Sequence, residues 1–120
     1  MTGVLDASRA GLIASFSLAG GVLSGKYRAG PVAGRAAGTL ADPRVAPAAA
    51  AAGELASLAA RLGTTPAALA LAFPFTHPAL ASVLFGATSP EQLRANCAAA
   101  RQLDRLAPDD VAALLRIGAR

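Results

Sequence analysis

The sequence predicts one α/β domain with two parallel strands and about four helices. Two short apolar runs, at residues 11–17 and 80–85, have the composition of buried strands. Two helical stretches lie between these runs and two follow them. Strands that alternate with helices pair in parallel through crossover connections. With 120 residues the chain is large enough for a single domain, residues 1–120, with a modest core.

Composition limits the class of partner. The apolar fraction is 54% and rich in alanine, so the core must come from leucine, valine, isoleucine and the four phenylalanines. A net charge of +4 and a pI near 10.6 would suit nucleic acid. The arginines are scattered, however, and Lys26 is the single lysine, so no basic stripe forms. We therefore expect no nucleic-acid partner.

Cysteine usage and hydropathy indicate the compartment. Cys97 is the single cysteine, so no internal disulfide can form, which favours a reducing compartment. On an alanine-rich helix we expect Cys97 to be a small buried apolar residue rather than a nucleophile. No signal peptide is evident, and Pro66, Pro74 and Pro78 interrupt the apolar region 62–86. These features predict a soluble, cytoplasmic chain with no membrane span.

The first predicted strand, residues 11–17, is apolar enough to be buried on both faces. It leads into a glycine-rich loop at 18–27. Residues 28–53 are rich in glycine, alanine and proline and show no helical or strand period, which predicts a loop. Within that loop, the alanine run at 47–52 could instead extend the next helix backwards.

The central segment predicts two helices. Residues 54–62 place leucine and alanine at i, i+3, i+4 and i+7, which is typical of an amphipathic helix that Gly63 ends. Thr65 caps the next helix, which is apolar all round and should be buried. Pro74 should end or kink that helix, because proline lacks the N–H that a helix requires.

The last third predicts a strand and two helices. His77 and Pro78 form a turn before the buried strand at 80–85. A helix covers residues 90 to about 102, and a final helix covers 108–117. The two aspartates in the first turn of the final helix are explained by the helix dipole, so we interpret them as a helix start and not as an acid–base pair. One histidine and one cysteine give no plausible metal-ligand set.

The strongest functional signal is the segment that follows the second strand. Gly86 allows a tight turn, and Ser89 opens a helix directly after it. A strand that ends beside a helix N-terminus offers unpaired N–H groups and partial positive charge to an anion, as in phosphate sites. Ser89 and Gln92 also form the capping box S-x-x-Q, which explains both residues without a ligand. For Gln92, cap and ligand contact remain open alternatives.

Two loops and the helix pair between them resemble the aldo/keto reductase family. ASFSLAGGVLSGKY (14–27) is similar to the segment after the family's seventh strand, and VLFGATSPEQLRAN (83–96) to the segment after its eighth. ELASLAARLGTTPAALALAF (54–73) resembles the intervening pattern LAxxLGxxPAxxAL. The resemblance covers nearly the whole chain and implies a partial TIM (β/α)8 barrel, the C-terminal portion with strands seven and eight.

The resemblance implies that NADP(H) lies across the carboxyl ends of the strands, where such barrels often bind phosphate. Carried over by position, the pyrophosphate side would be lined by Leu18, Gly21 and Lys26. The adenosine and its 2′-phosphate would be held by Gly86, Thr88, Gln92 and Asn96. We expect the two glycine-bearing strand ends to lie side by side and to present bare amides. Three residues have alternatives without a ligand: a turn for Gly86, the residue before a cap for Thr88, and an exposed polar side chain for Asn96.

The sequence departs from the family's pattern at the first loop. The family usually has an aromatic residue at the position of Ser15, stacked on the nicotinamide and followed by Ser-Pro. Here the aromatic is Phe16, one residue later, and the proline is absent. A shift of one residue in a strand moves a side chain to the opposite face.

The catalytic tetrad of the family (Asp, Tyr, Lys and His) belongs to its second, third and fourth strands, which this sequence does not match. The only Tyr, Lys and His are Tyr27, Lys26 and His77, at other positions, so no catalytic residue is assigned. The resemblance implies an NADP-dependent oxidoreductase that reduces a small-molecule carbonyl by hydride transfer, with this part inactive alone. The alternative is a non-catalytic module that binds a nucleotide, self-associates or completes a barrel with an N-terminal half.

Overall fold

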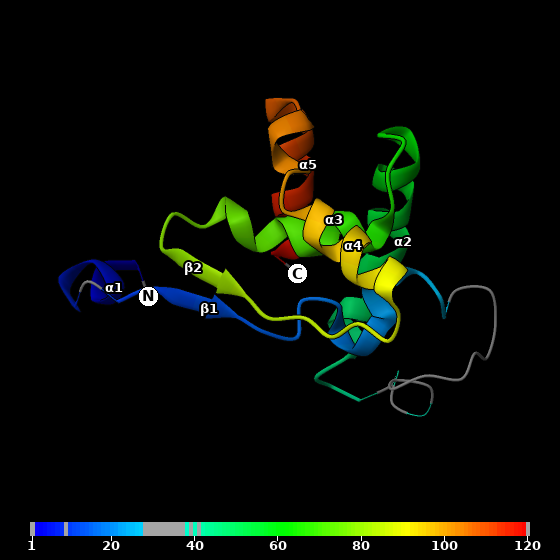
Figure 1. The fold of residues 1–120 in the computed structure, drawn as a ribbon, viewed down its shortest axis with the longest axis horizontal. Coiled ribbons are helices and arrows are strands. Elements are labelled where there is room, and N and C mark those ends of the chain that lie inside the picture. Colours follow the sequence, from blue (N-terminus) through cyan, green and yellow to red (C-terminus); the bar gives the residue numbers. More distant parts are fainter. Residues whose placement is uncertain (1, 9, 28–37, 39, 41, 120) are drawn as a thin grey trace.

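The computed structural model describes residues 2–8, 10–27, 38, 40 and 42–119 (Figure 1). Two strands, five α-helices and three short 3₁₀-helices follow one another in these residues. The N-terminal helix was not predicted. In chain order the elements are α1 (Thr2–Ser8), β1 (Leu12–Ala14), η1 (Ala19–Ser24), α2 (Ala46–Arg61), α3 (Pro66–Ala72), η2 (Phe73–Thr76), β2 (Leu80–Val83), α4 (Pro90–Ala99), η3 (Leu103–Arg105) and α5 (Pro108–Gly118).

The two strands form a parallel ladder, as predicted. Leu12 pairs with Leu80 and Ala14 with Val83, and the register is irregular after Leu12. The Leu84 N–H extends the ladder by donating to the Ala14 carbonyl at 2.8 Å. Since the strands are parallel, their carboxyl ends lie at the same edge of the sheet, and both following loops leave from that edge (Figure 1).

Both strands are shorter and more exposed than predicted. The first covers Leu12–Ala14 instead of 11–17, and the second Leu80–Val83 instead of 80–85. Ile13 is 60% exposed and Leu84 is 56% exposed, so the prediction of strands buried on both faces is wrong. The physical reason is that this narrow ladder lies to one side of the helical core (Figure 1).

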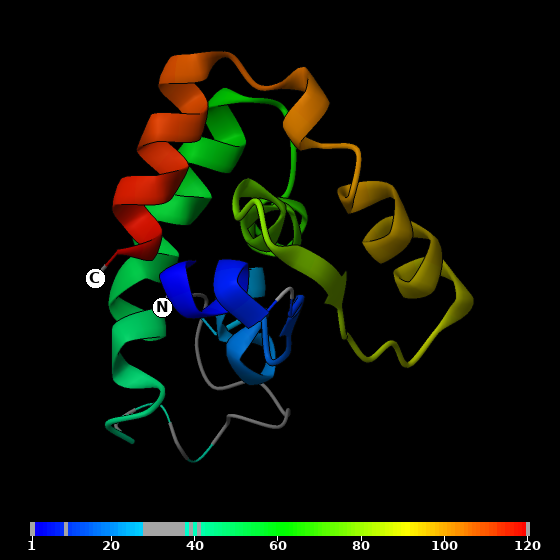
Figure 2. The ribbon, with the colours of Figure 1, turned by 90° about the vertical axis from the view of Figure 1, so that its left-hand side faces the viewer.

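The core lies between α2, α3 and α5; in Figure 2, α2 and α5 lie side by side on the left and α3 lies beside them near the centre. Leu69 of α3 and Leu114 of α5 are the largest fully buried side chains, and both contact a cluster that includes Leu55 and Leu58 of α2. The prediction that α3 is buried is confirmed, because its last four residues are all buried.

The helix α2 begins at Ala46, eight residues before the predicted start at 54 (46 against 54). The predicted loop 28–53 is therefore wrong over 46–53, and the alternative that the alanine run extends the helix backwards is confirmed. Ala52 joins Val45, Ala19 and Val22 in a second buried cluster, so tertiary packing on η1 stabilises this first part of the helix. Residues 28–37, 39 and 41 of the predicted loop lie outside the described residues.

The end of α2 and the start of α3 follow the prediction. Gly63 adopts φ +63° and the Thr64 N–H donates to the Ala59 carbonyl at 3.0 Å, which is a Schellman C-terminus. Thr65 caps α3 by accepting from the Ala68 N–H at 3.1 Å.

Proline and histidine control the path from α3 to β2. The α-helix ends at Ala72, and Pro74 lies in the 3₁₀ turn that follows, as predicted. His77 is the predicted turn residue: its Nδ1 accepts from the Ala79 N–H at 3.2 Å, and its carbonyl accepts from the Leu80 N–H at 3.1 Å.

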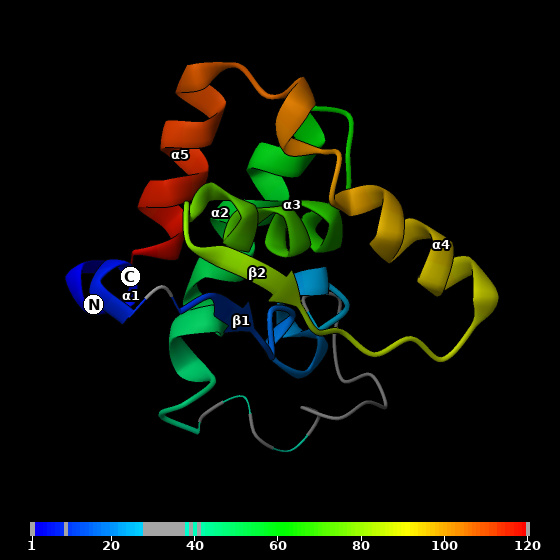
Figure 3. The same cartoon turned by 60° about the vertical axis from the view of Figure 1, so that its left-hand side comes forward.

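The two C-terminal helices bury one residue each, Ala99 in α4 and Leu114 in α5. The helix α4 ends at Ala99, three residues before the predicted 102, and packs against α3 (Figure 3). Cys97 is exposed, so the prediction of a buried cysteine is wrong. Its helix buries only Ala99 among its residues, because one narrow stripe faces α3. The final helix α5 was predicted within one residue, and Asp110 in its first turn lies 3.2 Å from the Arg61 guanidinium.

Within the described residues, no single helix is long and apolar enough to cross a membrane. Ala46–Arg61 and Pro66–Thr76 meet the length and composition criteria only as a pair, and they are bent by 103° at the break between them.

Candidate functional site

The candidate site is the edge of the sheet where β1 and β2 end. The loop after β1 contains Leu18, Gly21 and Lys26, and the loop after β2 contains Gly86 and Thr88 and leads to Gln92 and Asn96 on α4. Leu18 and Gly86 are 68 positions apart in the sequence, and the parallel ladder explains why the loops that contain them start from the same edge. All seven residues named from the sequence therefore belong to two loops and one helix at this edge.

The loop after β1 has an unusual backbone. Gly20, Gly21 and Gly25 have φ values of +67°, +96° and +83°, in the left-handed region that glycine adopts most easily. Phe16 (+62°) and Ala19 (+47°) lie in the same region, although they carry side chains. Left-handed backbone at residues other than glycine is uncommon and often marks a functional loop.

The Gly21 amide does not match the prediction. Its N–H donates to the Leu18 carbonyl at 2.8 Å, so it is not a bare amide, and the expectation is wrong at this position. The Leu18 carbonyl also accepts from the Leu23 N–H at 3.2 Å, while its side chain packs against the main core. Leu18 therefore anchors the turn, and the turn uses the amide of Gly21 internally.

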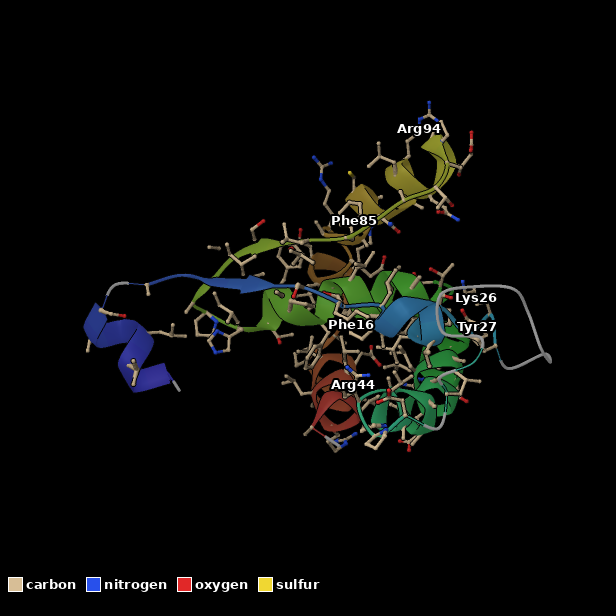
Figure 4. All side chains as sticks on the ribbon, turned by 90° about the horizontal axis from the view of Figure 1, so that it is seen from below. Phe16, Lys26, Tyr27, Arg44, Phe85 and Arg94 are labelled. Atoms are coloured by element: carbon tan, nitrogen blue, oxygen red, sulfur yellow. The ribbon has the colours of Figure 1, made fainter. Side chains whose placement is uncertain are left out.

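Lys26 lies against this turn with its side chain exposed. Its ammonium is 4.9 Å from the centre of the Tyr27 ring, within cation–π distance. A Cβ placed on Gly21 would come within 2.8 Å of the Lys26 Cε, so the lysine stem follows the surface where a side chain at 21 would be. Figure 4 shows Lys26 and Tyr27 together at the end of η1. Glycine at 21 thus allows both the left-handed turn and this position of the lysine.

The loop after β2 has free donors. Within the described part of the chain, the N–H groups of Gly86 and Ala87 donate to no group. Nothing lies within 4 Å of a Cβ placed on Gly86, and its φ is not left-handed, so the fold itself does not require glycine there. The space over Gly86 is open to the close approach of a ligand.

Polar side chains fix this loop to α4. The Gln92 Oε1 accepts from both the Thr88 N–H and the Thr88 hydroxyl, each at 2.9 Å. One turn further along α4, the Asn96 amide nitrogen reaches the Gly86 carbonyl at 3.5 Å. These contacts hold residues 86–88 against the N-terminus of α4 and leave the Gln92 amide nitrogen without a partner among the described residues.

One of the two hydrogen bonds of the predicted capping box forms. The Ser89 hydroxyl accepts from the Gln92 N–H at 3.2 Å, which confirms the first contact. The Gln92 side chain returns to Thr88 instead of to the Ser89 N–H. The capping alternative for Gln92 is thereby shown in this modified form, and its ligand alternative is compatible with it because the amide nitrogen is free.

Phe16 lies outside the strand, so the alternation of side chains along a strand does not describe it. The strand β1 ends at Ala14, so Phe16 is not part of the ladder. Its left-handed φ, and not the alternation of a strand, sets the direction of its side chain. Phe16 is 57% exposed and lies close to the start of η1 (Figure 4). The expectation that a shift of one residue places this side chain on the opposite face of a strand therefore does not apply to Phe16.

Charge and metal chemistry near the edge are limited. Arg94 on α4 points away from η1 in Figure 4, and its guanidinium is 3.8 Å from the Glu91 carboxylate. Within the loops at 15–27 and 84–89, all of whose residues the structure describes, Lys26 is the single cation. No group of three or more metal-binding side chains occurs in that same part of the chain. The chemistry available is therefore binding of an anion by amides and one ammonium.

Ser17, between Phe16 and Leu18, was not predicted as a functional residue. Its hydroxyl is buried and has no hydrogen-bond partner among the described residues. The available signal was a polar residue within an apolar run, at the position where the similar family has proline.

Comparison with known proteins gives two findings. The model of the Aldo/keto reductase family matches residues 3–118. A protein of Schizosaccharomyces pombe (strain 972 / ATCC 24843), named "Putative voltage-gated potassium channel subunit beta", is 32% identical over 100 residues. The match covers 77% of this chain and 29% of that relative, so the chain spans less than one third of the relative's length.

Proposed function

The chain belongs to the aldo/keto reductase family, and we propose that it is the cofactor-binding C-terminal part of an NADP(H)-dependent oxidoreductase that reduces a carbonyl. Family membership supports the oxidoreductase class. NADP(H), the partial barrel and the carbonyl substrate belong to the proposal. When bound, the nicotinamide supplies the hydride, and the residues described above bind and orient the cofactor.

The observation that carries the proposal is the parallel pairing of β1 and β2. It brings the glycine-rich turn with Lys26 and the open loop at Gly86 to one edge of the sheet. In TIM barrels this edge, after strands seven and eight, is a frequent phosphate site. The match of both loops to one family supports reading them as one site.

Each residue has a role that fits a dinucleotide. The Lys26 ammonium supplies positive charge to the pyrophosphate, and the free N–H groups of Gly86 and Ala87 supply neutral donors. Gln92 keeps a free amide nitrogen for a polar group of the adenosine portion. Leu18, Gly21, Thr88 and Asn96 shape the two loops through the contacts already given. In Phe16 the loop after β1 exposes an aromatic face that can stack on a planar ring.

The chain alone is proposed to be inactive. Lys26 and Tyr27 belong to the turn after β1, and His77 lies in the turn that precedes β2, on the other side of the strand from the candidate site. None of them lies at a position that matches the tetrad of the family, which comes from its second, third and fourth strands. Carbonyl-dependent oxidation of NADPH by the purified chain would contradict this part of the proposal.

Calorimetric titration with NADP⁺ tests the binding function. A charge-assisted contact is worth about 1.5–3 kcal/mol, so Lys26→Gln should weaken binding by about tenfold or more. Arg116→Gln removes another exposed charge, from α5, and should leave the affinity unchanged. No saturable heat with the unmodified chain, or equal losses in the two variants, would overturn the proposal.

A second function is favoured by the exposed strands. Ile13 on β1 and Leu84 beside β2 expose more than half of their surface, and a two-stranded ladder leaves unpaired groups on both edges. We propose as the alternative that the chain pairs with further strands, either an N-terminal barrel half or a second copy. Size-exclusion chromatography of the chain alone, and of the chain co-expressed with the first six strand–helix units of a family member, distinguishes these cases. Elution of the chain as a monomer in both experiments counts against this alternative.

A further inference from the structure

A surface pocket of about 570 Å³ lies between the start of α3 and the C-terminal half of α4, two helices that pack together (Figure 3). The residues that the two helices contribute to it are small: Ala68 from α3, and Ala95, Cys97, Ala98 and Ala99 from α4. None of the seven residues proposed for the cofactor lines this pocket. The chain therefore has a second concave surface to which the proposed function gives no role.

Two arginines give the pocket a positive charge. Arg101 and Arg105 line it from the turn and the 3₁₀-helix that follow α4, and both are exposed. Neither forms an ion pair within the described residues, whereas Arg61 and Arg94 each have a carboxylate partner. Asp104 lies between the two arginines in the sequence but is not part of the lining, which contains no carboxylate in the described part of the chain. A concave surface lined by one sign of charge attracts ions of the opposite sign.

Two threonines supply further hydrogen-bond donors to the same pocket. The Thr64 hydroxyl has no hydrogen-bond partner among the residues that the structure describes. The Thr65 oxygen accepts from the Ala68 N–H at 3.1 Å, so the hydrogen of this hydroxyl remains available to an acceptor. Guanidinium groups bind phosphate oxygens through paired N–H donors, and hydroxyl groups complete such contacts. The lining thus combines two unpaired cations with two hydroxyl donors.

The volume and the alanine wall define the rest of the ligand. Pockets for small molecules have volumes of about 300–1,000 Å³, so this one has room for an organic group beside a phosphate. The alanine side chains offer that group an apolar contact. We propose that the pocket binds a small phosphate monoester, with its phosphate on Arg101 and Arg105 and its organic group against the alanines.

Cys97 provides the readout for the test, because it lines this pocket, is exposed and is the single cysteine of the chain. N-ethylmaleimide is neutral and alkylates the thiol, so a ligand in the pocket should slow the reaction. Phenyl phosphate at about ten times its dissociation constant should slow it about tenfold, because about one pocket in ten remains empty. Phenol, which has the ring without the charge, should not protect at the same concentration and ionic strength. Absence of saturable protection by phenyl phosphate, or equal protection by phenol, would overturn the proposal.

Arginine variants identify the groups that bind the phosphate. Arg101→Gln and Arg105→Gln should each raise the concentration for half protection about tenfold or more, as expected for the loss of one charge-assisted contact. Arg94→Gln is the matched control, because it removes a charge from the same helix outside the lining and should leave that concentration unchanged. Each variant is compared with its own rate in the absence of ligand. Equal losses in all three variants would show a general effect of net charge and contradict the proposal.

The cofactor variant separates this pocket from the proposed NADP(H) site. Lys26→Gln should weaken binding of NADP⁺ and leave the protection by phenyl phosphate unchanged, since Lys26 does not line this pocket. Loss of protection in Lys26→Gln would overturn the assignment of a separate site. If NADP⁺ does not bind while phenyl phosphate still protects Cys97, the proposed function fails and the phosphate pocket is supported.

Discussion

Replacement of Ser17 by alanine should stabilise this protein. The hydroxyl is buried and makes no hydrogen bond within the described structure, so the substitution removes a desolvation cost without breaking a contact. Mutational data place the cost of burying an unpaired hydroxyl at about 1–3 kcal/mol. Since alanine keeps the Cβ and deletes one oxygen, the cavity grows little, and we expect a gain of about 1–2 kcal/mol in the free energy of unfolding.

Urea unfolding followed by circular dichroism measures this gain. With a slope of about 2 kcal/mol/M, a gain of about 1 kcal/mol raises the midpoint by about 0.5 M. Ser24→Ala is the matched control, because its hydroxyl lies in the same loop and donates to the Gly21 carbonyl at 2.6 Å. That variant should lose about 0.5–1.5 kcal/mol. If Ser17→Ala lowers the midpoint as Ser24→Ala does, the hydroxyl has a partner and the reasoning fails.

Substitutions at three further positions test the packing, the caps and the charges. Leu69→Ala should cost about 2–5 kcal/mol in urea unfolding, because the side chain is completely buried; a loss below about 1 kcal/mol would show a loose core. Thr65→Ala should cost about 1 kcal/mol by removing the cap on Ala68, and Thr65→Ser should restore most of it. Hydrogen bonds from Arg44 lower the pKa of Asp42 from 3.8 to about 2, so this pair stabilises the fold above pH 3.8 and the effect is lost as the pH falls towards 2. Carboxyl ¹³C shifts should titrate near pH 2 in the unmodified chain and at a higher pH in Arg44→Ala, which loses the side-chain bonds and keeps the backbone N–H bond to Asp42; equal values would contradict the pairing.

The sequence was sufficient for elements whose signals are local. Thr65 and Gly63 bound their helices through contacts within one turn, and Pro74 ends an α-helix by its own covalent structure. Parallel pairing also followed from the alternation of strands and helices. The caps and the helix end depend on neighbours a few residues away, which is the information that a local pattern contains, whereas the pairing follows from the order of the elements along the chain.

Features that depend on distant packing were predicted less well. The alanine run before residue 54 is helical because Ala52 is buried against η1, and no local period shows that contact. Cys97 is exposed because α4 contacts the rest of the fold along one side only, which its composition does not reveal.

The candidate site shows the same division. Its two loops were found from glycine and capping patterns, but the bond from Gly21 to Leu18 and the left-handed backbone at Phe16 arise from three-dimensional turn geometry. The buried hydroxyl of Ser17 likewise becomes visible only when the surrounding helices are in place. Sequence patterns located the loops, whereas the atoms free to bind a ligand follow from how each loop folds.

The proposed function requires the two loops to act as a single binding surface. NADP⁺ titration of the ¹⁵N-labelled chain measures this directly through the amides of Gly86 and Ala87 in one loop and of Gly25 and Lys26 in the other. Both sets should shift together and saturate at one dissociation constant. Shifts confined to one loop, or two unrelated saturation curves, would contradict a dinucleotide site shared by the ends of β1 and β2.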